Sequence, residues 1–457
     1  MMDNLDQSVV VSEGDAVNLT SGDHVDPSSS RDWPLVKRIV FRFVCAFLIL
    51  YNLQITLALL PWLGFLSAGF GDAIRVIVPW VAKTVFHCSG MAVTYFRTGS
   101  GDTTLSYVEF FCFLVLAIVA TIIWSLIDAK RKNYTALHAW LRLYTRYILA
   151  YWMFSYGFAK LIPPTQFPTP YLARLLERYG DFSPMGLLWT FMGYSRTYTY
   201  CCGIAEAAGG MLLLFKRTTT LGALVSGLCM ANVLLLNLSY DVPVKLFSAT
   251  LLLMAVFLSA PEIRRLVNFF VLNRPAVAEN MGPTLPRAPR MRIATTVLKS
   301  AVIAYLIYQT TLATYKQNQK YMTAAAKPPI QGIYDVEEFV RGGQVVQPLT
   351  TDAARWRAVV IQNYIGSNGA TVRMMDDSLV RYHAEFDVPK ATMTLTSGTD
   401  KNKKQSFTYT SIDANHVLLQ GSLDKEPVAI KLRRIDESKF LIVSRGFHWI
   451  TELSFNR

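Results

Sequence analysis

The sequence has few of the residues that redox chemistry requires. It contains six cysteines, none of them in a C-x-x-C pair or in the C-terminal third of the chain. A thioredoxin-like or quinone-reducing dithiol motif is therefore missing. The vicinal pair Cys201–Cys202 is one arrangement that suggests redox activity, and the alternative is that both are small packing residues.

Motifs for metals, haem, flavin and nucleotides are missing as well. The six histidines form no H-x-x-x-H or H-E-x-x-H pattern and do not pair at one depth of the apolar runs. The segment "GSGD" at 99–102 lacks the strand, lysine and helix of a phosphate-binding loop. We therefore expect no metal site and no soluble nucleotide chemistry.

What the chain has in abundance is apolar sequence. Hydrophobic residues make up 52% of its 457 residues and come in long blocks. Several blocks reach roughly 18 residues, about the length that crosses the hydrocarbon of a bilayer. The net charge of +13 comes from basic residues beside these blocks, as membrane topology requires. We therefore expect the lipid bilayer, and not nucleic acid, as the partner of these charges.

Seven apolar runs predict seven membrane-spanning helices. They cover about 39–63, 107–127, 141–162, 198–215, 219–237, 244–260 and 293–313. Residues 64–104 are predicted to be an outer loop with an interfacial helix or a re-entrant segment. The basic segments 128–140, 216–217 and 261–292 must share one side. This predicts a multi-pass protein of the cytoplasmic membrane with its N-terminus inside and its C-terminus outside.

Five regions follow from this division. Residues 1–32 are acidic and polar, and predict a disordered cytoplasmic tail. Residues 33–139 predict a membrane hairpin with its outer loop, and 140–275 a helical core. Residues 276–325 hold a linker and the last span. Residues 326–457 predict an extracytoplasmic β domain.

Short runs of alternating residues indicate the β domain. In "PVAIKLRRI", Val428, Ile430 and Leu432 share one face. Similar runs occur at 331–340, 356–362, 369–375, 378–386, 390–396, 405–411, 416–422 and 439–443. Eight or nine short strands separated by turn signals predict an all-β sandwich or a lipocalin-like barrel. Its interior either holds one small ligand or is filled by side chains.

Four polar residues at or near the outer half of the spans form a candidate site: Lys160, Glu206, Asn232 and Asp241. Glu206 lies roughly 12 Å below the outer end of its span, beside small residues that let another helix approach. An intramembrane acid is a functional-site hypothesis by default, and the alternative is a Glu that only locks two helices. We expect Glu206 to pair with Lys160. The alternative is that the Lys160 side chain extends to the membrane surface instead.

The segments "GFAKL" and "GIAEAAGGMLLLFKRTTTLGALV" resemble the DoxX family of small membrane proteins. In that family a G-x-x-K at a helix end precedes a G-x-x-E with glycines after it. The positions that match are Gly157, Lys160, Gly203, Glu206, Gly209 and Gly210. The resemblance covers about 140–260 and implies a four-helix core in which the glycines pack helices together. The other spans and the β domain depart from that pattern.

The resemblance implies two kinds of function. Some family members are associated with quinone-linked sulfur oxidation, which implies a quinone-like lipophile and a proton-coupled redox step at the outer face, with Glu206 as proton carrier and Lys160 as its partner. Some related proteins look like chaperones or assembly factors, which implies a non-catalytic protein whose β domain binds a lipid or a membrane-protein partner. No complete catalytic motif decides whether the chain is an enzyme.

Overall fold

A computed structural model describes residues 32–60, 62–95, 100–162, 166–275, 289–323, 327–364, 367–398, 403–446 and 448–452. The predicted tail, apart from Asp32, and 276–288 of the basic linker lie outside these residues.

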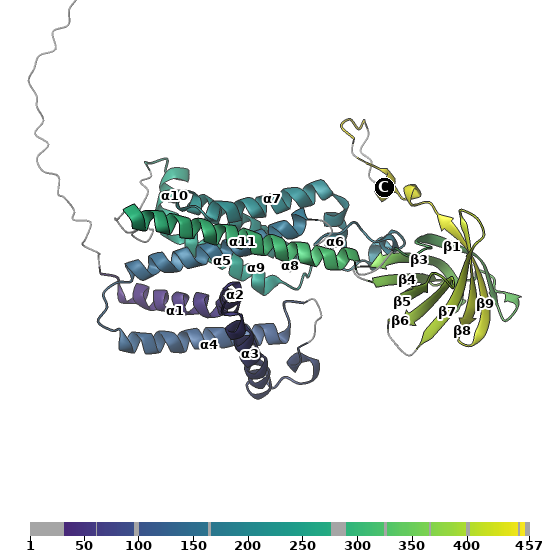
Figure 1. The fold of residues 1–457 in the computed structure, drawn as a ribbon, viewed down its shortest axis with the longest axis horizontal. Coiled ribbons are helices and arrows are strands. Elements are labelled where there is room, and N and C mark those ends of the chain that lie inside the picture. The colour runs from purple at the N-terminus through teal and green to yellow at the C-terminus, as the bar shows by residue number, and fades with distance from the viewer. Residues whose placement is uncertain are drawn as a thin grey trace, which may run out of the picture.

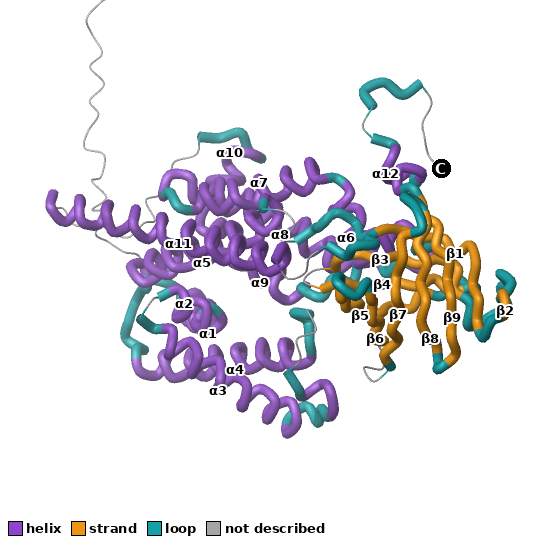
Figure 2. Tube along the Cα trace, turned by 45° about the vertical axis from the view of Figure 1, so that its right-hand side comes forward, coloured by secondary structure: helices purple, strands orange, loops and turns teal. Residues whose placement is uncertain are grey.

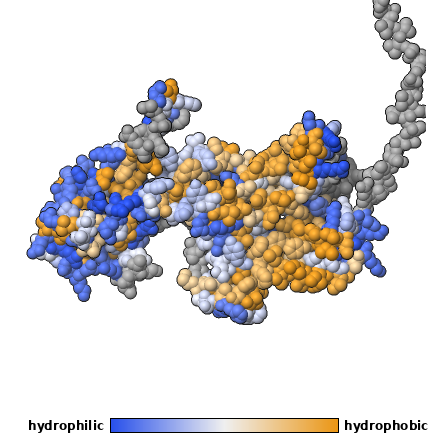
Figure 3. Space-filling model, turned by 180° about the vertical axis from the view of Figure 1, so that it is seen from behind, coloured by the Kyte–Doolittle hydropathy of each residue, from blue (hydrophilic) through white to orange (hydrophobic). Residues whose placement is uncertain are grey.

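The molecule consists of a helical bundle with a β-barrel at one end (Figure 1). The helices are α1 (Leu35–Tyr51), α2 (Leu53–Leu59), α3 (Gly64–Thr84), α4 (Thr104–Ile127), α5 (Thr135–Leu161), α6 (Pro184–Tyr194), α7 (Arg196–Leu213), α8 (Thr219–Ser239), α9 (Lys245–Ser259), α10 (Ile263–Phe270) and α11 (Pro289–Thr323). Hydrophobic residues cover the middle of the bundle surface, whereas the barrel and the opposite tip are hydrophilic (Figure 3). This distribution is compatible with a bundle embedded in a membrane.

Five helices in the described part of the chain are long and apolar enough to cross a membrane: α3, α4, α8, α9 continued by α10, and α11. The bent pair α1–α2 makes a sixth if it counts as one span. Helices α5 and α7 form where the third and fourth spans are predicted, but do not meet this measure because polar and charged residues lower their hydropathy. Many of those polar side chains, including Arg142, Arg146 and Lys160, are buried.

Two regions of the N-terminal part differ from the prediction. The first predicted span is not straight: α1 and α2 meet at Asn52 with a bend of 53°. The Asn52 side chain donates to the Leu48 carbonyl oxygen there. Within the predicted loop 64–104, residues 64–84 form the regular helix α3, which contains Pro79 and remains continuous. A helix was one of the two forms predicted there, but α3 is long and apolar enough to cross a membrane. The segment between the third and fourth predicted spans likewise contains a helix, α6.

The barrel is a closed antiparallel sheet (Figure 2). Its strands are β1 (Gly332–Arg341), β3 (Trp356–Tyr364), β4 (Ser367–Met374), β5 (Leu379–Asp387), β6 (Thr392–Ser397), β7 (Lys404–Ser411), β8 (His416–Leu423) and β9 (Glu426–Ile435). Each pairs with the next, and β1 pairs with β9 to close the barrel. The short β2 (Gln344–Val345) extends β1 in a hairpin that the alternation did not predict.

Apolar side chains fill the barrel interior. The predicted face of Val428, Ile430 and Leu432 is buried, with exposed fractions of 4%, 0% and 0%. The ring of Trp356 lies 5.8 Å from that of Phe407, so aromatic side chains of separate strands meet inside. Of the two interiors that the sequence left open, this packing favours the filled one.

The predicted strand at 439–443 is wrong. Residues Leu441–Ser444 form a short helix, α12, after a 3₁₀ turn at Glu437–Lys439. The barrel is already closed by the β1–β9 pairing, so a further strand would find no free edge beside β9. Asp436 starts the turn by accepting from the Ser438 backbone N–H. The last three residues of the apolar run "FLIV" therefore lie in a helix outside the barrel.

The barrel contacts the bundle through the segment between α5 and α6. That segment contains two 3₁₀ turns, Leu172–Leu175 and Tyr179–Asp181. The Ala173 backbone N–H donates to Oε1 of Gln362 in β3, at 3.2 Å. Asp377, in the turn between β4 and β5, pairs with Arg178 of the segment and with Arg357 and Arg373 of the barrel. The barrel therefore holds this connecting segment in place.

Candidate functional site

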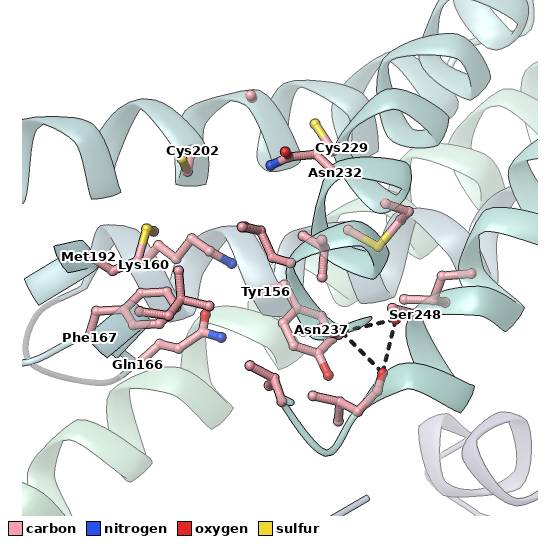
Figure 4. A pocket seen from close by; sticks show the side chains of 18 of the residues that line it. Tyr156, Lys160, Gln166, Phe167, Met192, Cys202, Cys229, Asn232, Asn237 and Ser248 are labelled. Carbon is pink, nitrogen blue, oxygen red and sulfur yellow. Dashed lines mark hydrogen bonds between the residues drawn. The ribbon is translucent and has the colours of Figure 1, made fainter. Parts of the chain in front are cut away.

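A cavity of about 340 Å³ lies among α5, α6, α7, α8 and α9. Its wall is mainly apolar, with Phe167, Trp189 and Phe247 among the large side chains that line it. Gln166 and Phe167, from the connecting segment, also belong to the wall (Figure 4). Because the barrel holds that segment, the cavity lies toward the barrel end of the bundle.

The cavity reaches the side of the bundle between α7 and α8. Cys202 and Ala205 of α7 line one side, and Leu228 and Asn232 of α8 line the other. Leu228 is 74% exposed, and Asn232 is exposed as well. The cavity wall is therefore continuous with the apolar lateral surface of the bundle, not only with its end.

The predicted pair of Lys160 and Glu206 is present. The Lys160 ammonium lies 2.7 Å from Oε2 and 3.0 Å from Oε1 of Glu206. Both residues are buried, with 7% and 3% exposed. Lys160 also belongs to the cavity wall, where Figure 4 shows its nitrogen directed toward the middle of the space. An ammonium group has three donors, and Glu206 supplies the two acceptors found for it among the described residues.

Small residues let α5 and α7 approach closely enough for this pair. A Cβ built on Gly157 would lie 2.9 Å from the Gly203 carbonyl oxygen, and one on Gly203 would lie 2.9 Å from that of Gly157. Gly210 meets the Ala150 carbonyl oxygen of α5 in the same way, at 3.2 Å. Gly209 faces α8, where a Cβ would lie 2.7 Å from the Ser226 hydroxyl. Three of the four glycines therefore pack α5 on α7, and the fourth packs α7 on α8.

The other two predicted site residues are not part of the ion pair. Asn232 lies on the cavity wall. Asp241 lies outside the cavity, in the turn before α9, where its exposed carboxylate pairs with Lys245 at 2.9 Å. The structure thus pairs Lys160 with Glu206 and places Lys160 and Asn232 on the wall of one cavity.

Several residues of the site carry no sequence signal of their own. The Gln166 carboxamide oxygen is buried and has no hydrogen-bond partner within the described residues. Asn237 donates to the Ser248 hydroxyl at 3.0 Å and to the Val244 carbonyl oxygen (Figure 4). Cys202 and Cys229 line the cavity, whereas Cys201 is exposed. Cys202 is the exception, because it stands out in the sequence as half of the vicinal pair Cys201–Cys202.

Within the part of the chain that the structure describes, no group of three or more acidic, histidine or cysteine side chains is placed to hold a metal ion. The chemistry that the arrangement offers is an ammonium at the wall of an apolar space, paired with a buried carboxylate. Such a pair can donate hydrogen bonds to an acceptor on a ligand, and its carboxylate can exchange a proton.

The comparisons with known proteins add one partial relative. No protein-family model and no solved structure matches the chain. Over 134 residues the chain is 28% identical to "Uncharacterized protein YwoB" of Bacillus subtilis (strain 168). This match covers 27% of the chain and 79% of the relative. A quarter of this chain therefore corresponds to most of a much smaller protein.

Proposed function

We propose that the chain is an integral membrane protein with a DoxX-like four-helix core that binds a lipophilic small molecule of the quinone type. The observation that carries the proposal is Lys160, a buried ammonium that lines the cavity and pairs with the Glu206 carboxylate behind it. Ligand sites are typically apolar spaces of about 300–1,000 Å³ with a few converging polar groups, and this cavity fits that description.

The lateral continuity of the cavity supports a ligand that comes from the bilayer. A lipophile dissolved in hydrocarbon would enter between α7 and α8 without crossing water. Its apolar part would contact the aromatic wall, and its carbonyl oxygen would accept a hydrogen bond from Lys160. Glu206 accepts hydrogen bonds from the same ammonium and would exchange a proton with it.

Ligand retention tests this proposal. Val233 lines the cavity, so Val233→Trp should fill the space and abolish co-purification of the ligand. The matched control is Leu235→Trp two residues on, where the side chain is 62% exposed. The measurement is mass spectrometry of organic extracts, with an optical spectrum of the purified protein. Equal amounts of the same lipophile from both variants would contradict the proposal, as would extracts of the native protein with membrane phospholipid alone.

A second candidate function is the assembly or binding role, favoured by the segment after the barrel. Leu441, Ile442 and Val443 are 46–52% exposed, and Trp449 is 91% exposed. Exposed apolar residues at such density are typical of contact sites for proteins or lipids. Removing residues 440–452 would abolish partner capture under this alternative and leave ligand retention unchanged under the first.

The orientation is part of the same proposal. The start of α1, α10 and the start of α11 lie at the end of the bundle away from the barrel (Figure 1). The basic segment before α5 lies at the same end, because the Trp33 backbone N–H donates to the Lys132 carbonyl oxygen at 2.9 Å. Positive charge marks the cytoplasmic side, so we place the barrel outside.

Cysteine labelling in intact cells tests the orientation. A membrane-impermeant maleimide should label Lys390→Cys in the barrel, where the side chain is 77% exposed. It should label Arg290→Cys at the other end of α11 only after lysis. The native chain, with exposed Cys201, gives the background. The reverse pattern would place the barrel inside the cell.

A further inference from the structure

A buried arginine lies at the end of the bundle away from the barrel. Arg146 of α5 is 8% exposed, and its Nη1 donates to the Thr219 hydroxyl at 3.1 Å. That hydroxyl donates in turn to the Phe215 carbonyl oxygen at 3.0 Å. The Nε of Arg146 is buried and has no hydrogen-bond partner in the described chain. The guanidinium also lies 5.4 Å from the ring centre of Tyr147. A buried charge without an anion is unfavourable, so an anion bound beside this guanidinium would stabilise it.

A second cation faces the same place from α11. The Lys299 ammonium lies 5.6 Å from the ring centre of Phe215, the residue whose carbonyl oxygen accepts from the Thr219 hydroxyl that Arg146 contacts. No ion pair of Arg146 or Lys299 with an acid occurs among the residues that the structure describes. By contrast, Arg142, one turn earlier in α5, donates to the Leu258 carbonyl oxygen and is attracted by Glu262.

The start of α8 lies at this place. Helix α8 begins at Thr219, and the preceding Thr218 gives no side-chain cap. The Thr218 hydroxyl instead donates to the Leu212 carbonyl oxygen at 2.7 Å. The first N–H groups of a helix carry partial positive charge and bind anions. Two cations and a helix start therefore converge beside the turn Lys216–Thr218.

The surface around these cations is apolar. On α11, Val297 and Leu298 are 62% and 65% exposed and flank Lys299, and Val302 follows at 38%. On α8, Leu221 is 52% exposed. A ligand with a negative head and hydrocarbon chains matches this surface, because the head would meet Arg146 and Lys299 while the chains would lie along α11 and α8.

We propose that Arg146, Lys299 and the start of α8 bind the head-group phosphate of an anionic phospholipid in the leaflet away from the barrel. The guanidinium of Arg146 has a planar set of donors that suits phosphate oxygens, and Lys299 supplies a second charge. Basic pockets between helices on the cytoplasmic side bind anionic head groups in this way. The site is separate from the cavity and does not depend on the ligand proposed there.

Binding of phosphatidylglycerol to the full-length protein in neutral detergent tests this site. We expect native mass spectrometry to show retained phosphatidylglycerol and little phosphatidylcholine at equal concentration. Arg146→Met should weaken phosphatidylglycerol binding by about tenfold or more, since hydrogen bonds to charged groups contribute roughly 1.5–3 kcal/mol. Arg217→Met removes the same charge from an exposed position of the neighbouring turn and should weaken it far less.

A second variant and a competition experiment complete the test. Lys299→Met removes the partly exposed cation and should also weaken binding, which covers the case in which Arg146→Met fails to fold. Inorganic phosphate should not displace the lipid, because it lacks the chains that contact α11; displacement would show a free-anion site and overturn the assignment. Equal binding of both lipids, or equal losses in Arg146→Met and Arg217→Met, would overturn it as well.

Discussion

Glu206→Gln is expected to destabilise the detergent-solubilised protein by about 3–5 kcal/mol, because it leaves the Lys160 ammonium buried without its counter-charge. Lys160→Met should have a similar effect, since it leaves the Glu206 carboxylate alone in the bundle. The two side chains meet at 2.7 Å with at most 7% of either residue exposed, so water cannot replace the lost partner. The measurement is the free energy of unfolding in a fixed detergent.

The double variant separates pairing from two independent losses. Glu206→Gln with Lys160→Met removes both charges and should recover part of the stability, so the two effects are not additive. Asp241→Asn is the control, because Asp241 also contacts a lysine, Lys245, at 2.9 Å, but its carboxylate is 85% exposed. Exposed pairs contribute little, so this change should hardly alter stability.

Each outcome of this cycle distinguishes between two roles of Glu206. Additive losses would mean that the carboxylate and the ammonium do not stabilise each other, contrary to the contact. Full stability of Glu206→Gln together with loss of the bound lipophile would show that the carboxylate serves the ligand and not the packing. If Glu206→Gln lowers stability but the folded fraction retains the ligand, the carboxylate serves to hold α5 against α7. Glu206 would then have no part in the proposed proton transfer.

The barrel was predictable because its signal is local. A strand buried on one face repeats every two residues, and turns separate the repeats, so most of the strands follow from the sequence alone. The run at 439–443 has the same apolar character, but whether it becomes a strand depends on a free edge. The pairing of β1 with β9 occupies that edge. No residue within 439–443 indicates that the edge is occupied.

The bundle was predictable in part for a related reason. Apolar length locates helices well, as for α4, α8 and α9. It fails where polar residues are buried against other helices, as in α5. The bend after α1 depends on contacts of Asn52 that length and composition do not encode.

The site shows the same division between local and distant information. Glycine spacing and one acid indicated the contact of α5 with α7 and the pair at its centre. By contrast, Asp241 was predicted to belong to the site because its expected depth in the membrane matched that of the other three residues. Its side chain nevertheless faces solvent. Asp102 accepts hydrogen bonds from the Lys245 and Leu246 backbone N–H groups at the start of α9, across more than 140 residues. Nothing near Asp102 in the sequence indicates that partner.

Gly203→Leu is expected to destabilise the protein by about 3 kcal/mol or more, because overpacking a close contact forces backbone shifts. Even the Cβ alone would lie 2.9 Å from the Gly157 carbonyl oxygen, and that neighbour is backbone of α5, which cannot rotate away. Gly157→Leu meets the Ala207 backbone nitrogen at the same distance and should be equally damaging. The measurement is the thermal midpoint and the yield of monodisperse protein.

Gly69→Leu is the control for these two changes, because Gly69 is an exposed helix position with nothing within 4 Å of a built Cβ. It should be neutral or slightly stabilising, since leucine favours a helix over glycine by up to about 1 kcal/mol. The milder Gly203→Ala also tests the link to the ion pair. Separating α5 from α7 by even a few tenths of an ångström lengthens the Lys160–Glu206 contact, so the coupling measured in the double-variant cycle should shrink in that background. An unchanged coupling would show that the pair tolerates the shift, and that the glycines serve helix packing without positioning the two charges.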